Sequence, residues 1–310
     1  ETAMSRHFFH SRSFRIAAAA ALSTSWPAGA QLVAYDGFAN GPLPDLAGST
    51  GGSGWTSAWN GSASTLVTSI AGPGLTFPGL ATSPGAAVTE PQVFYPDAAS
   101  YTRSIQPITG GHFYMSFLLR PGAQYTTLGA GIRWGAYPGW ILCGAPDGSA
   151  YGFHVGRYIY VYSNAPVVSG QTVLIVMDME VIPGTPAQTV YRMYINHPVG
   201  QPQPGFADAE YATGGAVAMP SAIEIANDGD YTTDEIRIGT TWASVLPSPC
   251  YANCDASTTA PILNVLDFSC FLNRFAAGDT YANCDNSTTP PALNVLDLSC
   301  FLNRFATGCN

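Results

Sequence analysis

The sequence has no lysine, and charged residues of either sign are scarce. Its 310 residues carry eleven basic side chains, all arginine, against twenty acidic ones, which gives a formal net charge of −9. Charged residues make up 10% of the chain, whereas an average globular protein has about 25%. Aromatic residues make up 12% of it, and a disordered chain has many charges and few aromatics. The composition therefore indicates a folded protein, and its acidic balance argues against a nucleic-acid partner.

The chain lacks an apolar run long enough to cross a membrane, but its N-terminus has the pattern of an export signal. Residues Ser5–Arg15 are polar and basic, Ile16–Leu22 are apolar, and Ala28–Ala30 are small. A bilayer span needs about 20 apolar residues, whereas this order of segments is typical of a secretory signal peptide. We predict a signal peptide over residues 1–30, starting at Met4 and cleaved after Ala30. The mature protein is then expected to be secreted and associated with the cell surface, without a transmembrane segment.

Cysteine is nearly absent from the first 249 residues. Cys143 lies alone in an apolar run and is expected to be a buried free thiol. The other six cysteines are Cys250, Cys254, Cys270, Cys284, Cys300 and Cys309. Six cysteines in a short segment of an exported protein indicate a disulfide framework.

The composition changes at a proline-rich tetrapeptide, Leu246–Pro249. Upstream, short apolar or alternating segments are separated by Gly, Pro, Asn and Asp. About a dozen such strands with no long helix are typical of a β-sandwich or barrel. We predict a β-sandwich domain over 31–246, a linker over 247–249 and a second domain over 250–310, which we call the tail.

One predicted strand of the sandwich carries tyrosine at every second position. Tyr158, Tyr160 and Tyr162 share a face of that strand. Such a row can bind sugar rings, and we list the three tyrosines as candidate ligand-binding residues. A cross-strand aromatic ladder or a half-buried sheet face is the simpler interpretation.

The tail consists of two copies of one sequence. Residues 251–279 and 281–309 align at an offset of 30. In the first copy Asn264 is a good N-cap with Asp267 three residues on, and Phe268, Phe271 and Phe275 share a helical face with Leu272. Each copy is therefore predicted to be a loop followed by an amphipathic helix, and the two helices are expected to pack together.

The loop before each predicted helix is rich in oxygen-bearing side chains. In the two copies these are Asn253, Asp255, Ser257, Asn264 and Asp267, and Asn283, Asp285, Ser287, Asn294 and Asp297. Their order resembles that of a 12-residue calcium loop, but about three residues are inserted around Thr258–Pro261 and the tight-turn glycine is missing. We predict weak Ca²⁺ binding. The alternative is that these residues only form helix caps and Asx turns.

The tail resembles a dockerin domain of the cysteine-containing type found in secreted planctomycete-type proteins. The resemblance rests on the Asn-Cys-Asp start, the Leu-Asn-Val-Leu-Asp core and the terminal Gly-Cys. It implies calcium ligation by the loop residues and a cohesin-like or other cell-surface protein as partner. Within it, Cys254–Cys270, Cys284–Cys300 and Cys250–Cys309 are the preferred disulfides. Fifteen connectivities exist, and the rival arrangement pairs Cys254 with Cys300 and Cys270 with Cys284.

Three stretches of the first domain resemble concanavalin A-like, laminin-G-type jelly rolls. They are the opening strand and loop from Val33 to Trp59, the central segment from Val173 to Asn196, and the closing segment Asp234–Trp242. The resemblance implies a jelly-roll sandwich that binds carbohydrate or protein, or cleaves β-glucans. It also implies that Asp36 and Asp234, on the first and last strands, are candidate ligands of a structural Ca²⁺.

The sequence has no reactive constellation of catalytic residues. Asp178 and Glu180 share a strand face, but the chain lacks the glutamate spacing of β-glucanases and the common nucleophile and metalloprotease motifs. We therefore expect a secreted, non-catalytic binding or display protein that recognises carbohydrate or a protein ligand and is attached to an extracellular assembly by its tail. The alternatives are a glycan-active hydrolase and a structural subunit of a surface layer or filament.

Overall fold

The computed structural model describes most of the chain after residue 30. The described residues are 31–61, 67–83, 87–89, 100–108, 111–123, 129–135, 140–156, 159–184, 187–227, 229–247, 250–255, 257, 263–285 and 287–308. The predicted signal peptide, Tyr158 and Cys309 lie outside them. Among the described residues, no helix is long and apolar enough to span a bilayer.

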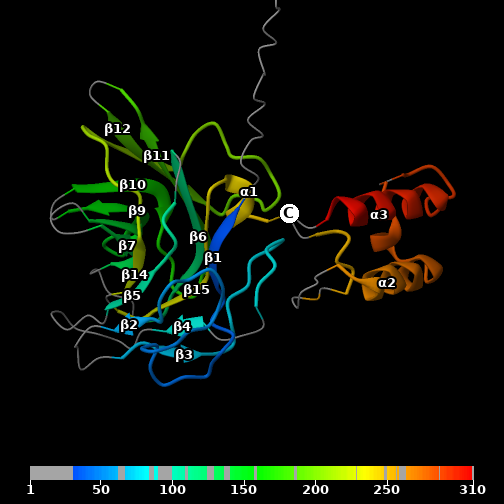
Figure 1. Cartoon of the computed structure of the whole chain (residues 1–310), viewed down its shortest axis with the longest axis horizontal. Coiled ribbons are helices and arrows are strands. Elements are labelled where there is room, and N and C mark those ends of the chain that lie inside the picture. The colour runs from blue at the N-terminus through cyan, green and yellow to red at the C-terminus, as the bar shows by residue number, and fades with distance from the viewer. Residues whose placement is uncertain are drawn as a thin grey trace, which may run out of the picture.

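Two antiparallel sheets form the larger part of the molecule (Figure 1). The first sheet contains β1 (Leu32–Asp36), β3 (Ser69–Ala71), β4 (Ala87–Thr89), β6 (His112–Pro121), β11 (Val173–Ile182), β12 (Gln188–Ile195), β13 (Ala209–Thr213) and β15 (Tyr231–Gly239). Its order is β13-β12-β11-β6-β15-β4-β3, with β1 also paired to β15. The second sheet contains β2 (Asn60–Gly61), β5 (Ser100–Ser104), β7 (Ala130–Trp134), β8 (Ile141–Ala145), β9 (Ala150–Val155), β10 (Ile159–Pro166) and β14 (Ala222–Asn227), in the order β10-β9-β8-β7-β14-β5-β2.

The core lies between the sheets because successive strand residues point to opposite faces. Phe117 and Met177 of the first sheet and Ile132 and Phe153 of the second are fully buried in one hydrophobic cluster. Free Cys143 is buried in the same cluster, as its apolar surroundings predicted. The predicted mainly β sandwich with a small helical C-terminal part is thereby confirmed.

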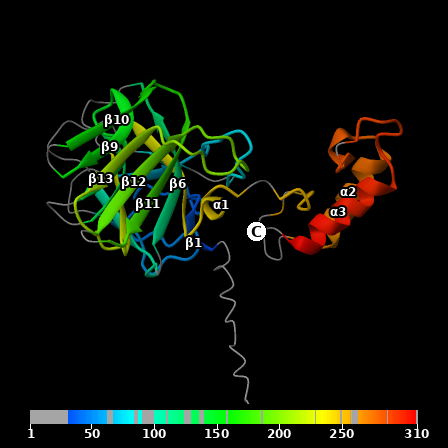
Figure 2. The ribbon, with the colours of Figure 1, turned by 90° about the horizontal axis from the view of Figure 1, so that it is seen from above.

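A short helix covers one end of the outer face of the first sheet. The short helix α1 (Trp242–Val245), which Thr241 and Ser244 cap, packs over Leu118 and Leu174 in a second apolar cluster. Figure 2 shows α1 beside β6, on the side away from β11. Further along the same strands the outward residues become polar, and this part of the face carries the candidate site described below.

One buried ion pair links the two sheets through the core. Asp36 at the end of β1 contacts Arg103 of β5, with 2.5 Å between Oδ2 and Nη1, and both side chains are almost fully buried. Trp59 donates its indole N–H to the same carboxylate at 2.9 Å, and the backbone N–H of Phe38 donates to its other oxygen. Every oxygen of this buried carboxylate therefore has a hydrogen-bond donor.

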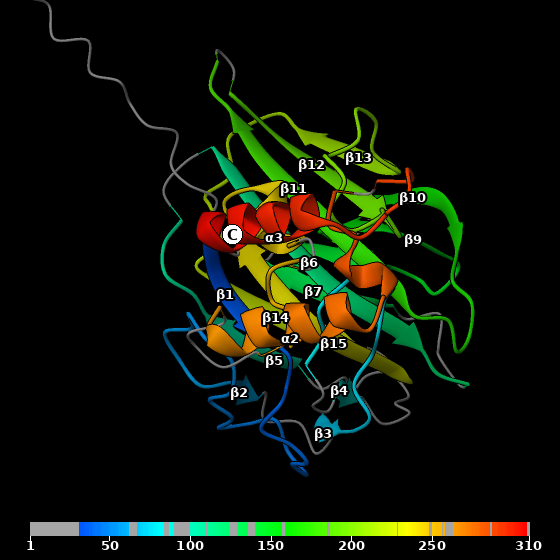
Figure 3. The same cartoon turned by 90° about the vertical axis from the view of Figure 1, so that its right-hand side faces the viewer.

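The tail folds as a pair of helices with internal pseudo-twofold symmetry. Helices α2 (Val265–Ala276) and α3 (Val295–Thr307) lie side by side in Figures 1 and 3, with the 3₁₀ turn η1 (Thr280–Ala282) between them in the chain. Phe271 and Phe301 stack at a ring distance of 4.2 Å in the middle of the pair. The rings of Tyr251 and Tyr281 also stack, at 4.8 Å, and each hydroxyl donates to the other residue's carbonyl. Neither helix thus buries its aromatic face without the other.

The helix caps and disulfides follow the repeat. Asn264 and Asn294 are N-caps, and Asp267 and Asp297 complete a capping box in each copy. Cys254–Cys270 and Cys284–Cys300 are disulfide-bonded, so each bridge ties a loop to the helix that follows it. Cys250 is also disulfide-bonded. These two bridges are the preferred pairs rather than the rival cross-repeat pairs.

Candidate functional site: a polar pocket on the first sheet

A pocket of about 490 Å³ opens on the outer face of the first sheet, beside the loop that joins β12 to β13. Its lining residues are Arg192, Tyr194, Gln203, Pro204, Gly205, Phe206, Ala207 and Glu210. Strand pairing explains why they meet. Arg192 lies opposite Asp178 of β11 on one side and Glu210 of β13 on the other, so their side chains project from the same face. The pocket therefore has a floor of β-sheet and a wall of loop.

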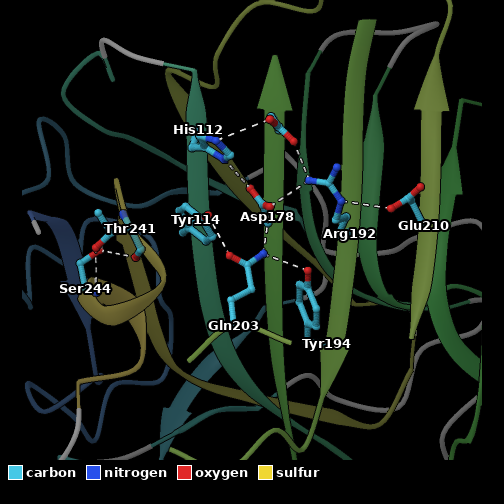
Figure 4. Close-up of polar contacts among 10 residues, drawn as sticks. His112, Tyr114, Asp178, Arg192, Tyr194, Gln203, Glu210, Thr241 and Ser244 are labelled. Carbon is cyan, nitrogen blue, oxygen red and sulfur yellow. Dashed lines mark hydrogen bonds and ion pairs between the residues drawn. The ribbon is translucent and has the colours of Figure 1, made fainter. Parts of the chain in front are cut away.

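Asp178 is the centre of the hydrogen-bond network beneath the pocket (Figure 4). Its side chain is 1% exposed, and its carboxylate contacts Nη1 of Arg192 at 3.2 Å, Nε2 of Gln203 at 3.1 Å and Nδ1 of His112 at 3.0 Å. Glu180, two residues on, contacts the same Arg192 nitrogen at 2.7 Å. These contacts compensate the negative charge of Asp178, which would otherwise be costly to bury.

Gln203 links the loop between β12 and β13 to the first sheet through hydrogen bonds. Its amide nitrogen donates to Asp178 and to the Tyr194 hydroxyl at 2.9 Å, and its amide oxygen accepts from the Tyr114 hydroxyl at 3.0 Å. Three strands thus hold one loop side chain. Because both ends of the amide are engaged, the loop is fixed where it approaches the strands.

The two tyrosines and the arginine of this network keep their protons. Burial raises the pKa of Tyr114, and the Asp178 carboxylate raises it further, so its phenol stays protonated. Burial also raises the pKa of Tyr194, although its hydrogen bond with Gln203 acts in the opposite direction. For Arg192, burial lowers the pKa, but the hydrogen bond with Glu180 and the neighbouring carboxylates raise it more, so the net shift is upward. Neither tyrosine is therefore suited to act as a base.

Phe206 is the most exposed large apolar side chain of the described chain, at 93% of its maximum. It lies on the loop wall three residues after Gln203 and lines the pocket. Leaving an aromatic ring in water has no benefit for folding. A flat apolar ring beside fixed polar groups is what a ligand with both apolar and hydroxyl surfaces needs.

The tyrosine row lies elsewhere, on the outer face of the second sheet. Tyr160 stacks on His154 at 4.1 Å and faces Tyr162 at 6.0 Å with nearly parallel rings. The Tyr162 hydroxyl donates to Asp147 at 2.6 Å. Sugar binding by this row stays a prediction, and Tyr158 lies outside the described residues.

The candidate calcium ligands of the sandwich each have their own partners. Asp36 contacts Arg103 and Trp59, whereas Asp234 accepts the backbone N–H groups of Leu75, at 2.7 Å, and Glu235. Among the described residues, no contact joins the two carboxylates, and no cluster of three metal-ligating His, Cys, Asp or Glu side chains is present. A shared Ca²⁺ site stays a prediction.

The tail loops place most of their candidate ligands in local hydrogen bonds. Asp267 accepts from the backbone of Asn264 and Asp255, and Ser257 donates its backbone N–H to both Asn253 and Asp255. The interpretation as caps and Asx turns thus describes the first loop.

The second loop differs from the first at the side-chain oxygen of its first asparagine. Asp297 accepts from the backbone of Asn294 and Asp285, and Asp285 accepts from Ser287, as their counterparts do. Asn283 Oδ1, however, is buried and has no hydrogen-bond partner among the described residues. An unpartnered oxygen in an oxygen-rich loop fits a hard cation such as Ca²⁺. Asn283, Asp285, Ser287 and Asp297 are the side chains that would hold it, and the ion would cross-link loop and helix.

Comparison with known proteins gives structural similarity without a family. No family model and no curated protein matches the chain. Domain 4 of AbnA, a GH43 extracellular arabinanase from Geobacillus stearothermophilus, solved with arabinotriose, is 18% identical, with 70% of this chain and 97% of that one covered and a TM-score of 0.37. The cellulose induced protein Cip1 is 11% identical over 59% and 91% of the two chains, with a TM-score of 0.37.

A third similar structure is a glycosyl hydrolase family protein from Mycobacterium fortuitum. It is 11% identical over 67% of this chain and 99% of that one, with a TM-score of 0.36. At these scores we take no functional argument from the similarity. The dockerin resemblance of the tail stays a prediction.

Proposed function

We propose that this chain is an exported, non-catalytic carbohydrate-binding protein, with the pocket beside Phe206 as its saccharide site. The observation that carries the proposal is an exposed aromatic ring next to a rigid network of polar groups. Sugar rings have apolar C–H faces, which pack on aromatic rings, and hydroxyl edges, which bond to fixed polar groups. The side chains of Tyr194, Gln203 and Glu210 supply the polar part of the pocket.

The tail completes the proposal as an attachment module. Val265 and Leu266 at the start of α2, and Val295 and Leu296 at the same positions of α3, are exposed apolar pairs on a small helical unit. Repeated exposed apolar pairs support a protein partner, and the dockerin resemblance suggests a cohesin-like one, with Ca²⁺ in the loops. The signal peptide over 1–30 and the linker over 247–249 belong to the same proposal. Binding of the full chain to immobilised cohesin modules, with and without chelator, tests this part.

Hydrolysis is the second candidate function because Asp178 and Glu180 converge on one cation. Retaining glycosidases need a protonated acid and a free nucleophile about 5–5.5 Å apart. Here both carboxylates contact Arg192, and Asp178 also bonds to Gln203 and His112. The Asp178 carboxylate is also 1% exposed, so it is not placed to attack a bound sugar, and this geometry favours binding.

We expect Phe206→Ala to weaken saccharide binding by about two- to tenfold, because an aromatic contact contributes roughly 0.5–1.5 kcal/mol and 1.4 kcal/mol is a factor of ten. The melting temperature should not change, since the ring is almost fully exposed. The measurement is isothermal titration calorimetry with the oligosaccharide that binds best in a glycan-array screen of the full chain.

Ile159→Ala is the matched control, since Ile159 is an exposed apolar residue on the second sheet. Equal affinities of the Phe206 variant and the wild type would refute the assignment of the pocket. Release of reducing sugar during the titration, abolished in Glu180→Gln, would establish hydrolysis instead.

A further inference from the structure

The electrostatics of the pocket narrow the class of saccharide, an inference that rests on the proposed function. Arg192 is the one basic side chain among the described residues that line the pocket. It contacts three carboxylates: Asp178 at 3.2 Å, Glu180 at 2.7 Å and Glu210 at 3.0 Å. Three carboxylates against one guanidinium leave an excess of negative charge at the site.

The guanidinium also cannot offer an acidic sugar the two-nitrogen contact that it would need. Arginine binds a carboxylate best through two parallel N–H donors. In this pocket Nη1 is held by Asp178 and Glu180, and Nε is held by Glu210. A ligand carboxylate could therefore bind two nitrogens of Arg192 only by replacing one of these groups.

His112 does not supply a second cation for the ligand. Its Nδ1 faces Asp178 at 3.0 Å, and its Nε2 lies 3.7 Å from Glu180, so both ring nitrogens are directed at carboxylates of the same network. The ring stacks on Tyr114 at 5.6 Å. The imidazole is therefore directed at the carboxylates of the network rather than at a ligand.

The same carboxylates favour hydroxyl donors. Glu210 is 57% exposed at the rim and can accept hydrogen bonds from sugar hydroxyls, which are stronger to an ionised acceptor than to a neutral one. The net charge of −9 repels polyanions at longer range as well.

We infer that the pocket binds an uncharged, hydroxyl-rich glycan and rejects polyuronates. The Phe206 ring packs on the apolar face of a sugar, while Glu210, Gln203 and Tyr194 contact its hydroxyls. Uronic acids are disfavoured because Glu180 and Glu210 already form ion pairs with Arg192, the cation that a uronate carboxylate would need.

The test compares the two ligand classes on the full chain. Isothermal titrations at low salt would use neutral arabinan, xylan and β-glucan oligosaccharides in one arm, and alginate and polygalacturonate oligosaccharides in the other. We expect at least one neutral oligosaccharide to bind, and the polyuronates to bind at least tenfold more weakly than it does. Glu210→Gln should raise the affinity for polyuronates by about threefold, the scale of an exposed charge, without strengthening neutral binding.

Glu224→Gln is the control for charge alone. Glu224 forms an ion pair with Arg133 on the second sheet, so the substitution removes the same charge away from the pocket and should leave both affinities unchanged. Tighter binding of polyuronates than of every neutral oligosaccharide would overturn this inference and leave the proposed function standing. Binding of neither class would overturn the proposed function itself.

Discussion

Arg103→Met is expected to destabilise the sandwich by about 3–5 kcal/mol, the cost of leaving a buried charge without its partner. Asp36 is fully buried, and Arg103 at 2.5 Å is the cation that compensates it. The guanidinium also lies over the Trp55 ring at 4.7 Å and donates to the Ser57 carbonyl, so the substitution loosens the loop between β1 and β2 as well. Thermal and urea unfolding of the full chain measure the change.

The pH dependence of this variant separates lost charge from lost packing. Burial raises the pKa of Asp36, while Trp59, Phe38 and Arg103 act against that shift. Without Arg103 the folded-state pKa rises further above the unfolded value of about 3.9. A raised carboxyl pKa contributes stability that is present below the unfolded value and lost as pH rises, so the deficit of Arg103→Met should grow from pH 4 upward.

Asp36→Asn in the same background is the matched control. It removes the charge but keeps an oxygen for Trp59, so it should recover part of the stability at pH 7 and flatten the pH profile. A deficit that is the same at pH 4 and pH 8 would show that packing, not charge, is what Arg103 provides.

The parts of the fold that local patterns determine were predictable. Asn264 and Asp267 stand three residues apart, which is sufficient for a capping box, and the structure has that box in both repeats. The apolar segment Val173–Ile182, of the kind that is typical of a buried strand, likewise forms β11. Each of these features depends on residues within a few positions of one another.

The pocket depends instead on long-range pairing, and most of its residues were missed. Asp178 and Glu180 could be recognised as sharing a face, but nothing near them in sequence indicates that Arg192 lies opposite or that Glu210 lies one strand further on. Gln203 and Phe206 belong to a loop, where no periodicity predicts direction. An exposed phenylalanine in Gln-Pro-Gly-Phe was the one signal available, since a turn sequence rarely needs an aromatic residue.

Reduction of the disulfides is expected to unfold the tail and leave the sandwich folded. Each of the bridges Cys254–Cys270 and Cys284–Cys300 joins cysteines 16 residues apart in the sequence. A bridge of this span stabilises the folded state by about 3 kcal/mol, because it lowers the conformational entropy of the unfolded chain. A helical unit of this size has a small core, here centred on Phe271 and Phe301, and such cores rarely supply more than about 3–5 kcal/mol. Losing both bridges therefore removes more stability than the core provides.

Calorimetry of the full chain with and without reductant measures this, and the sandwich transition is the internal control because Cys143 is free. If the second loop binds Ca²⁺ through Asn283 and Asp297, added calcium should raise the temperature at which the tail unfolds. The increase should be largest in the reduced protein, because no disulfide then joins the loop to the helix. With the disulfides intact, a chelator should change the unfolding temperature of the tail only slightly. A tail transition that survives reductant but is lost with chelator would show that the metal, rather than the bridges, holds these loops on their helices.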